Sequence, residues 1–164
     1  MAQWFIGQEA KDKRHKSKHS VDPDLSVEDK SKELPQEILG ITDSHPYYTQ
    51  QLASTVWELL VRFGFSSGIV ETAANEIVKS HDNDYERLWN NFNRTDMMVL
   101  NGMSASYISP LSDEFSRLFG TGASSTVFST LQRLTHKGII LKEGSVYSID
   151  DPFFKRWIVL RRNE

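Results

Sequence analysis

The sequence predicts a mainly α-helical fold with one small β-hairpin. Apolar residues recur every three or four positions through most of residues 43–137, which is the spacing of amphipathic helices. Glycine, proline and short polar residues interrupt these stretches repeatedly and divide them into separate helices. Residues 139–149 differ, because two short apolar runs there flank a glycine turn, which is typical of a hairpin.

Composition sets the broad class of protein. The chain has 164 residues, of which 38% are hydrophobic, enough for one modest domain or two very small ones. A net charge of −3 gives no overall polybasic signal for nucleic acid or membranes. The chain has no cysteine, which excludes disulfides, thiolate metal sites and cysteine nucleophiles. No apolar run approaches the roughly 20 residues of a membrane span, and the start lacks the pattern of a secretory signal. We therefore expect a cytoplasmic protein.

Residues 1–40 are predicted to be irregular, because they show few large apolar residues and no sustained periodicity. The basic stretch from Lys11 to His19 is interpreted as a solvated charge run. Contact with phosphate or with a partner is the alternative interpretation of this stretch.

Residues 41–93 are predicted to form three packed helices. Asp43 or Ser44 is the expected cap of the first, and Pro46 suits its first turn. Ser66 or Ser67 is the expected cap of the second. The apolar stripes of the three helices are, in order, Tyr48, Leu52, Val56, Leu59 and Phe63; Ile69, Val70, Ala73, Ala74, Ile77 and Val78; and Tyr85, Leu88, Trp89 and Phe92.

Residues 94–164 are predicted to contain three further helices, a hairpin and a last helix. Thr95 is the expected cap of the first helix, Gly120 ends the second and Gly138 ends the third. The expected strands are Ile139–Leu141 and Val146–Ile149. The last helix is expected from Asp151, with Asp151 as its cap and Pro152 in its first turn. Three helices followed by a two-stranded hairpin is the order of a winged helix.

The third of these helices offers a candidate contact surface. Its projection places Val127, Leu131 and Leu134 toward the core. The opposite face carries hydroxyls suited to phosphate, with Gln132 and Arg133 suited to base edges. The residues expected at DNA or a partner are Ser125, Thr126, Ser129, Gln132, Arg133, Lys137 and Lys142, with His136 on the same face and backbone contacts from Arg161 and Arg162. A protein-binding winged helix is the alternative, because DNA-reading helices usually carry more charge.

Two strings give a family resemblance. "HPYYTQQLASTVWELL" and "SSTVFSTLQRLTHKGIILKEGSVYSIDDPFFKRWI" resemble the C-terminal region of archaeal-type ATPases, P-loop proteins of the AAA+/STAND group. The resemblance covers about residues 41–164 and implies a helical lid at 41–93 followed by a winged helix at 94–164. It also implies that His45 and Pro46 lie beside a nucleotide, ATP being the cofactor of intact members. Ser44 departs from the family pattern, which has glycine at that position.

The nucleotide-binding core of that family is missing. A phosphate-binding loop requires a glycine followed directly by lysine, and none of the nine glycines is so followed. No apolar strand ending in paired acids serves as a Walker B motif, and residues 1–40 are too short for a nucleotide-binding core. The five histidines show no metal-binding spacing. We therefore expect no enzyme activity, no cofactor and no metal site in this chain.

The expected function is that of a non-catalytic C-terminal fragment or relative of such an ATPase, whose winged helix binds DNA or protein in a regulatory role. One alternative is a stand-alone DNA-binding regulator. Another is an adaptor that docks on an ATPase core supplied by another chain, which predicts an exposed apolar patch that includes Tyr47 and Trp57. A remnant without selected activity is a third alternative.

Overall fold

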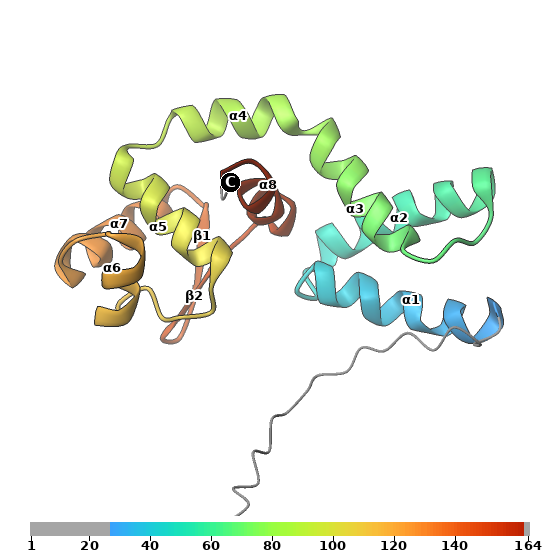
Figure 1. Ribbon diagram of the computed structural model, residues 1–164, viewed down its shortest axis with the longest axis horizontal. Coiled ribbons are helices and arrows are strands. Elements are labelled where there is room, and N and C mark those ends of the chain that lie inside the picture. The colour runs from blue at the N-terminus through green and yellow to red at the C-terminus, as the bar shows by residue number, and fades with distance from the viewer. Residues whose placement is uncertain (1–26, 163–164) are drawn as a thin grey trace, which may run out of the picture.

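The computed structural model describes residues 27–162, with side chains described from residue 32 onward. Within this range the chain forms helices and one two-stranded antiparallel sheet, so the predicted fold class is confirmed (Figure 1). The elements are α1 (Val27–Ile41), α2 (Pro46–Phe63), α3 (Ile69–Ser80), α4 (Asp82–Asn90), α5 (Arg94–Ala105), α6 (Asp113–Phe119), α7 (Ser124–His136), β1 (Ile140–Glu143), β2 (Val146–Ile149) and α8 (Pro152–Arg162).

Helix α1 corrects the expectation that residues 1–40 are irregular. It begins at Val27, well before the predicted start of ordered structure. Ile38 is buried, and Leu34 and Ile41 pack partly buried against the same core. These three residues have helical spacing, but they lie among charged residues and Pro35, which hid the pattern. The basic stretch Lys11–His19 lies outside the described residues.

Helices α1, α2 and α3 pack together as a bundle, on the right in Figure 1. Leu52, Val56 and Leu59 of α2 are buried, as the predicted stripe requires, and so are all six apolar residues predicted for α3. Phe63 is the exception, with 78% of its surface exposed. It is the last residue of α2, and no described element covers that end of the helix.

The turn between α1 and α2 differs from the predicted cap. Asp43 and Ser44 do not cap α2; they adopt left-handed backbone conformations, with φ of 48° and 60°, and reverse the chain between the two helices. His45 occupies the capping position without a side-chain hydrogen bond, and Pro46 begins the helix as predicted. Gly68, also left-handed, stands at the start of α3 where a serine cap was expected.

Helix α4 crosses from the bundle to the remaining elements (Figure 1) and buries Tyr85 and Trp89. Helix α5 then begins at a capping box: Asn93 accepts from the N–H of Asp96 at 2.9 Å, and Asp96 accepts from the N–H of Asn93 at 3.2 Å. The expected cap, Thr95, lies inside the helix. Asp151 caps α8 as predicted, because Oδ1 accepts from the N–H groups of Phe153 and Phe154.

The hairpin follows α7 through a left-handed Gly138 with φ of 70°, as predicted. The N–H of Gly138 bonds to Thr135 and that of Ile139 bonds to Leu134, which is the Schellman arrangement of a helix end. Strand β1 begins one residue later than predicted, at Ile140, which pairs with Ile149.

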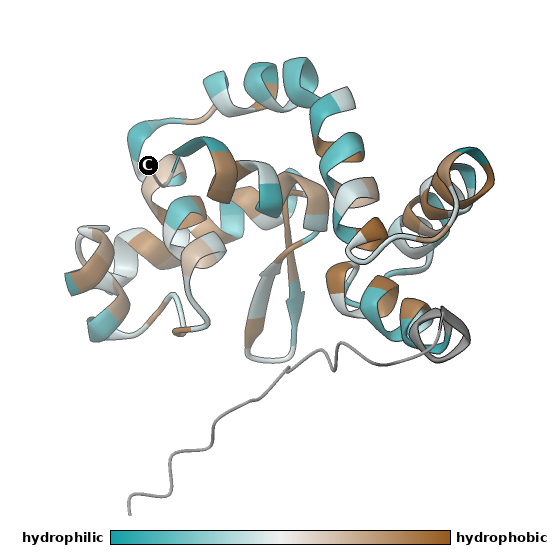
Figure 2. Ribbon diagram, turned by 45° about the vertical axis from the view of Figure 1, so that its right-hand side comes forward, coloured by the Kyte–Doolittle hydropathy of each residue, from teal (hydrophilic) through white to brown (hydrophobic). Residues whose placement is uncertain are grey.

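Helix α8 belongs to both halves of the molecule. It packs against α3 and α4 on one side and against α5 and β2 on the other. Phe153, Phe154 and Trp157 are buried in a hydrophobic core that is continuous through both halves. Figure 2 shows brown, hydrophobic ribbon segments among these central elements, with teal segments prominent on the outward-lying α4.

Three arginines of α8 form ion pairs with acidic residues of earlier helices. Arg156 pairs with Glu71 of α3, and Arg161 and Arg162 pair with Asp82 and Glu86 of α4. These three ion pairs join α8 to α3 and α4.

Candidate interaction surfaces

Helix α7 presents the faces that the sequence predicted. Val127, Leu131 and Leu134 are fully buried. The opposite face exposes the predicted polar residues Ser125, Thr126, Ser129, Gln132, His136 and Lys137. The face is polar but has few charges, and its hydroxyls include Ser129, which donates back to the Ser125 carbonyl at 3.0 Å.

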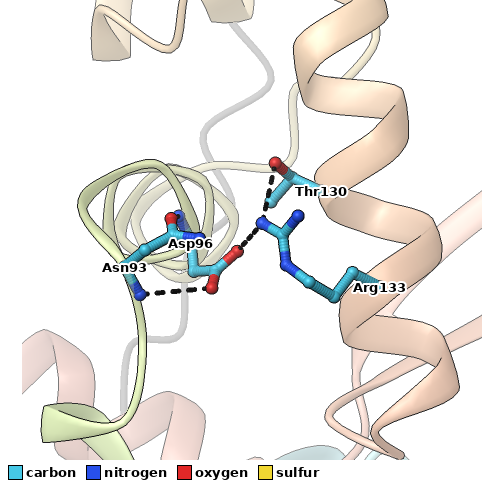
Figure 3. Close-up of polar contacts among 4 residues, drawn as sticks. All are labelled: Asn93, Asp96, Thr130 and Arg133. Carbon is cyan, nitrogen blue, oxygen red and sulfur yellow. Dashed lines mark hydrogen bonds and ion pairs between the residues drawn. The ribbon is translucent and has the colours of Figure 1, made fainter.

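The side chain of Arg133 was expected to contact base edges of DNA, but it pairs within the fold instead. Its guanidinium forms an ion pair with Asp96 of α5, a carboxylate that is only 1% exposed (Figure 3). The same nitrogen lies 3.4 Å from the Thr130 hydroxyl. Because Asp96 also belongs to the capping box of α5, Arg133 ties α7 to the start of α5. No local sequence pattern predicts this pair, because its members are 37 residues apart.

The other cations assigned to DNA also have partners within the fold. Lys137 lies 5.9 Å from the ring centroid of Phe92, and Lys142 lies 5.5 Å from that of Tyr147. Arg161 pairs with Asp82 at 2.8 Å, and Arg162 pairs with Glu86. Lys137 and Lys142 remain exposed. Among the cations assigned to DNA, only Lys137 and Lys142 have no carboxylate partner in residues 27–162, so the predicted contact set offers little positive charge to a phosphate backbone.

His45 and Pro46 line a groove of about 800 Å³ between the α1–α2 turn, the loop after α5 and the hairpin. The ionisable residues of its lining are Asp43, Glu143, Asp150, Lys155, His45 and two tyrosines. Three carboxylates against one lysine repel a triphosphate, which requires converging donors and positive charge. The residues present do not fit the nucleotide implied by the family resemblance.

One face of α2 carries large apolar side chains in contact with solvent. Tyr47 is 64% exposed, Trp57 67% and Val61 68%, and helical spacing places them on the side opposite the buried stripe. We call these three residues the α2 face. The exposure of Tyr47 and Trp57 agrees with the adaptor hypothesis, and Val61 adds a residue that the sequence analysis did not assign.

Several ionisable groups at the junction of the two halves have shifted pKa values. The indole N–H of Trp157 donates to Asp82 at 2.7 Å and holds the pKa of that carboxyl below its usual range, with a further contribution from Arg161. Burial raises the pKa of Tyr85, and the nearby negative charge of Asp151 raises it further. The pKa of Tyr48 is raised for the same reasons.

Within residues 27–162, no group of three or more histidine, aspartate and glutamate side chains is placed to hold a metal ion. No helix in this range is long and apolar enough to cross a bilayer.

Comparison with known proteins identifies one part of the chain. Comparisons with curated proteins and with solved structures give no match. Residues 83–160 match a family described as a probable winged helix domain. This match begins inside α4 and includes α5 to α7, the hairpin and most of α8. Together with the order of these elements, it shows that a winged-helix domain is present at residues 83–160.

Proposed function

We propose that this protein is a non-catalytic, protein-binding module in which the winged helix supports a helical bundle that docks on a partner through the α2 face. The observation that carries the proposal is the exposure of Tyr47, Trp57 and Val61 along one side of an 18-residue helix. Tryptophan and tyrosine are enriched among the residues that dominate protein–protein affinity. A helix with an apolar face suits a hydrophobic groove of a partner.

The partner proposed for first testing is the nucleotide-binding core of a separate P-loop ATPase. The support for this choice is the resemblance of residues 41–164 to the lid and winged helix of archaeal-type ATPases, which in that family accompany such a core. On this proposal the chain is a non-catalytic relative of that family and hydrolyses no ATP itself. Release of phosphate from ATP by the pure protein, at a rate above that in buffer alone, would contradict the proposal that the chain is non-catalytic.

The test uses the intact chain with a photo-crosslinking residue in place of Trp57, expressed in its natural host. We expect crosslinks to a protein with a P-loop core, and reconstituted binding that Trp57→Ser weakens at least about tenfold, as for a central aromatic contact. Phe63→Ser is the matched control, because Phe63 is similarly exposed on α2 but lies off the α2 face. Equal effects of both substitutions, or crosslinks only to proteins without a P-loop, would overturn the proposal.

Duplex DNA is the second candidate partner, favoured by the exposed polar face of α7 with Ser125, Thr126 and Gln132. Binding of the intact chain to a labelled random duplex at several salt concentrations tests it. For DNA binding, Lys137→Ala and Lys142→Ala each lower the salt slope by about one. A duplex that does not bind at low salt would exclude this candidate.

A further inference from the structure

The groove beside the hairpin is a second feature without an assigned role. Consecutive residues Ser145–Asp150, which include all of β2, line one wall. The loop Ser106–Pro110 lies across from them, and the turn Thr42–Pro46 closes the groove. Figure 2 shows the hairpin extending away from the helices, with the α5–α6 loop on one side and the bundle on the other. A volume of about 800 Å³ is within the range of ligand-binding clefts.

The backbone of β2 is open toward one side. Paired residues of an antiparallel ladder alternate between hydrogen-bonded and non-hydrogen-bonded positions. The N–H of Asp150 bonds to the Ile139 carbonyl at 3.0 Å, and the pairing of Ile140 with Ile149 follows directly after it. Tyr147 and Ile149 therefore occupy non-hydrogen-bonded positions, and their N–H and carbonyl groups point away from β1. Within residues 27–162, no other backbone group bonds to them.

The charge of the groove is unbalanced. Asp43, Glu143 and Asp150 contribute carboxylates, whereas Lys155 is its only lysine or arginine among the described residues. The ammonium group of Lys155 lies 5.4 Å from the ring centroid of Tyr107 and makes a cation–π contact with that ring. The remaining walls include apolar side chains from the loop and the hairpin, namely Ile108, Pro110, Leu141 and Val146.

We propose that the groove binds an extended, lysine- or arginine-rich peptide of a partner protein, which adds to β2 as a third strand. The open groups of Tyr147 and Ile149 would bond to the peptide backbone, as in other cases of strand addition. Basic side chains of the peptide would face Asp43, Glu143 and Asp150, and alternating apolar side chains would contact the walls. The groove lining shares no residue with the α2 face, so this inference goes beyond the function proposed above.

The probe is a labelled heptapeptide in which lysine alternates with valine, titrated into the intact protein and followed by fluorescence anisotropy. We expect saturable binding that weakens as salt is raised, because the groove is acidic. A peptide with glutamate in place of lysine should bind at least about tenfold more weakly, since like charges then face each other. A peptide with N-methyl groups on alternate amides should lose about two- to tenfold for each missing hydrogen bond.

Two sets of substitutions place the peptide at β2. Tyr147→Pro removes an N–H that faces the groove and is not needed for pairing with β1, so it should weaken binding relative to Tyr147→Ala. Asp43→Asn with Glu143→Gln should weaken binding and flatten the salt dependence. Asn is chosen at position 43 because it tolerates the left-handed backbone found there.

Trp57→Ser, which is expected to weaken docking through the α2 face, should leave heptapeptide binding unchanged. It therefore separates this inference from the function proposed above. Absence of saturable binding at about 1 mM peptide would overturn the inference. So would equal affinity for the N-methylated peptide, a result that does not depend on whether any protein variant folds. Binding that appears only after residues 1–26 are deleted would assign the groove to the chain's own basic stretch and overturn the partner assignment.

Discussion

The hydroxyl of Tyr85 donates a 2.9 Å hydrogen bond to Asp151, which lies 66 residues further along the chain. The other carboxylate oxygen of Asp151 caps α8. One carboxylate thus fixes both the start of α8 and its position against α4. The junction between the bundle and the winged helix consequently depends on directional polar contacts as well as on apolar packing.

Tyr85→Phe is expected to lower the free energy of unfolding by about 1–2 kcal/mol, because it removes a hydrogen bond to a charged, partly buried acceptor. Urea denaturation followed by circular dichroism measures the change. Tyr47→Phe, on an exposed tyrosine with no hydrogen bond to its hydroxyl among the described contacts, is the matched control and should have little effect. Equal losses for the two variants would show that the Tyr85–Asp151 bond does not stabilise the junction.

Asp82 predicts an acid dependence of stability. Its pKa is lowered, first by the hydrogen bond from Trp157 and then by Arg161. The unfolded chain therefore takes up a proton at higher pH than the folded chain does. The ionised Asp82 carboxylate therefore stabilises the folded state fully at pH values above the pKa of the unfolded chain, about 3.9. This stabilisation is lost as the pH falls through the lower pKa of the folded state. Asp82→Asn does not titrate, so the difference in melting temperature between this variant and the wild type should narrow below about pH 4. A difference that stays constant down to pH 2 would contradict the assignment.

The Asp96–Arg133 pair is expected to stabilise the winged helix. Asp96→Ala removes both the partner of Arg133 and half of the α5 capping box, and should cost about 2–4 kcal/mol. Arg133→Ala should cost less, because Asp96 keeps the backbone N–H of Asn93 as a donor. A double-mutant cycle by denaturation measures the coupling energy of the pair. Independent, additive effects of the two substitutions would show that the pair contributes nothing beyond each residue alone.

Gly102 allows α5 and α6 to approach closely. A Cβ atom at this position would lie 2.8 Å from a ring carbon of Phe119 and closer still to Phe115. Gly102→Ala is therefore expected to destabilise the protein by about 1–3 kcal/mol through overpacking. Gly40→Ala is the matched control. Position 40 is also helical and no atom of the described residues lies within 4 Å of the added Cβ, so the effect on stability should be neutral or favourable. Thermal unfolding measures the melting temperatures of both variants. Equal melting temperatures for the two would show that close packing at Gly102 does not contribute to stability.

The sequence predicted the order of the elements from α2 to α8 and most of the buried stripes, because burial repeats at the period of each secondary structure and is readable locally. It did not predict the partners of long charged side chains. Arg133 is on the polar side of α7 by projection, yet its flexible stem lets the guanidinium reach Asp96 on another helix. The spacing of Asn93 and Asp96 is that of a capping box and was the one local sign that Asp96 has a structural role.

Helix α1 and the groove were missed for different reasons. The apolar positions of α1, Leu34, Ile38 and Ile41, are too few among charged residues to give a clear period. The groove combines three segments that are distant in sequence, and its main feature, the open edge of β2, depends on backbone pairing that no side-chain pattern encodes.

The position of α8 between both halves has a consequence for the order of events during synthesis. Helices α1 to α7 and the hairpin leave the ribosome before α8. Until residues 152–162 follow, α3, α4, α5 and β2 lack the helix against which they pack. Nascent chains therefore expose the apolar surfaces that later receive Phe153, Phe154 and Trp157. Completion of the fold is therefore delayed until α8 has cleared the exit tunnel, and the exposed apolar surfaces make the nascent chain prone to aggregation during this interval.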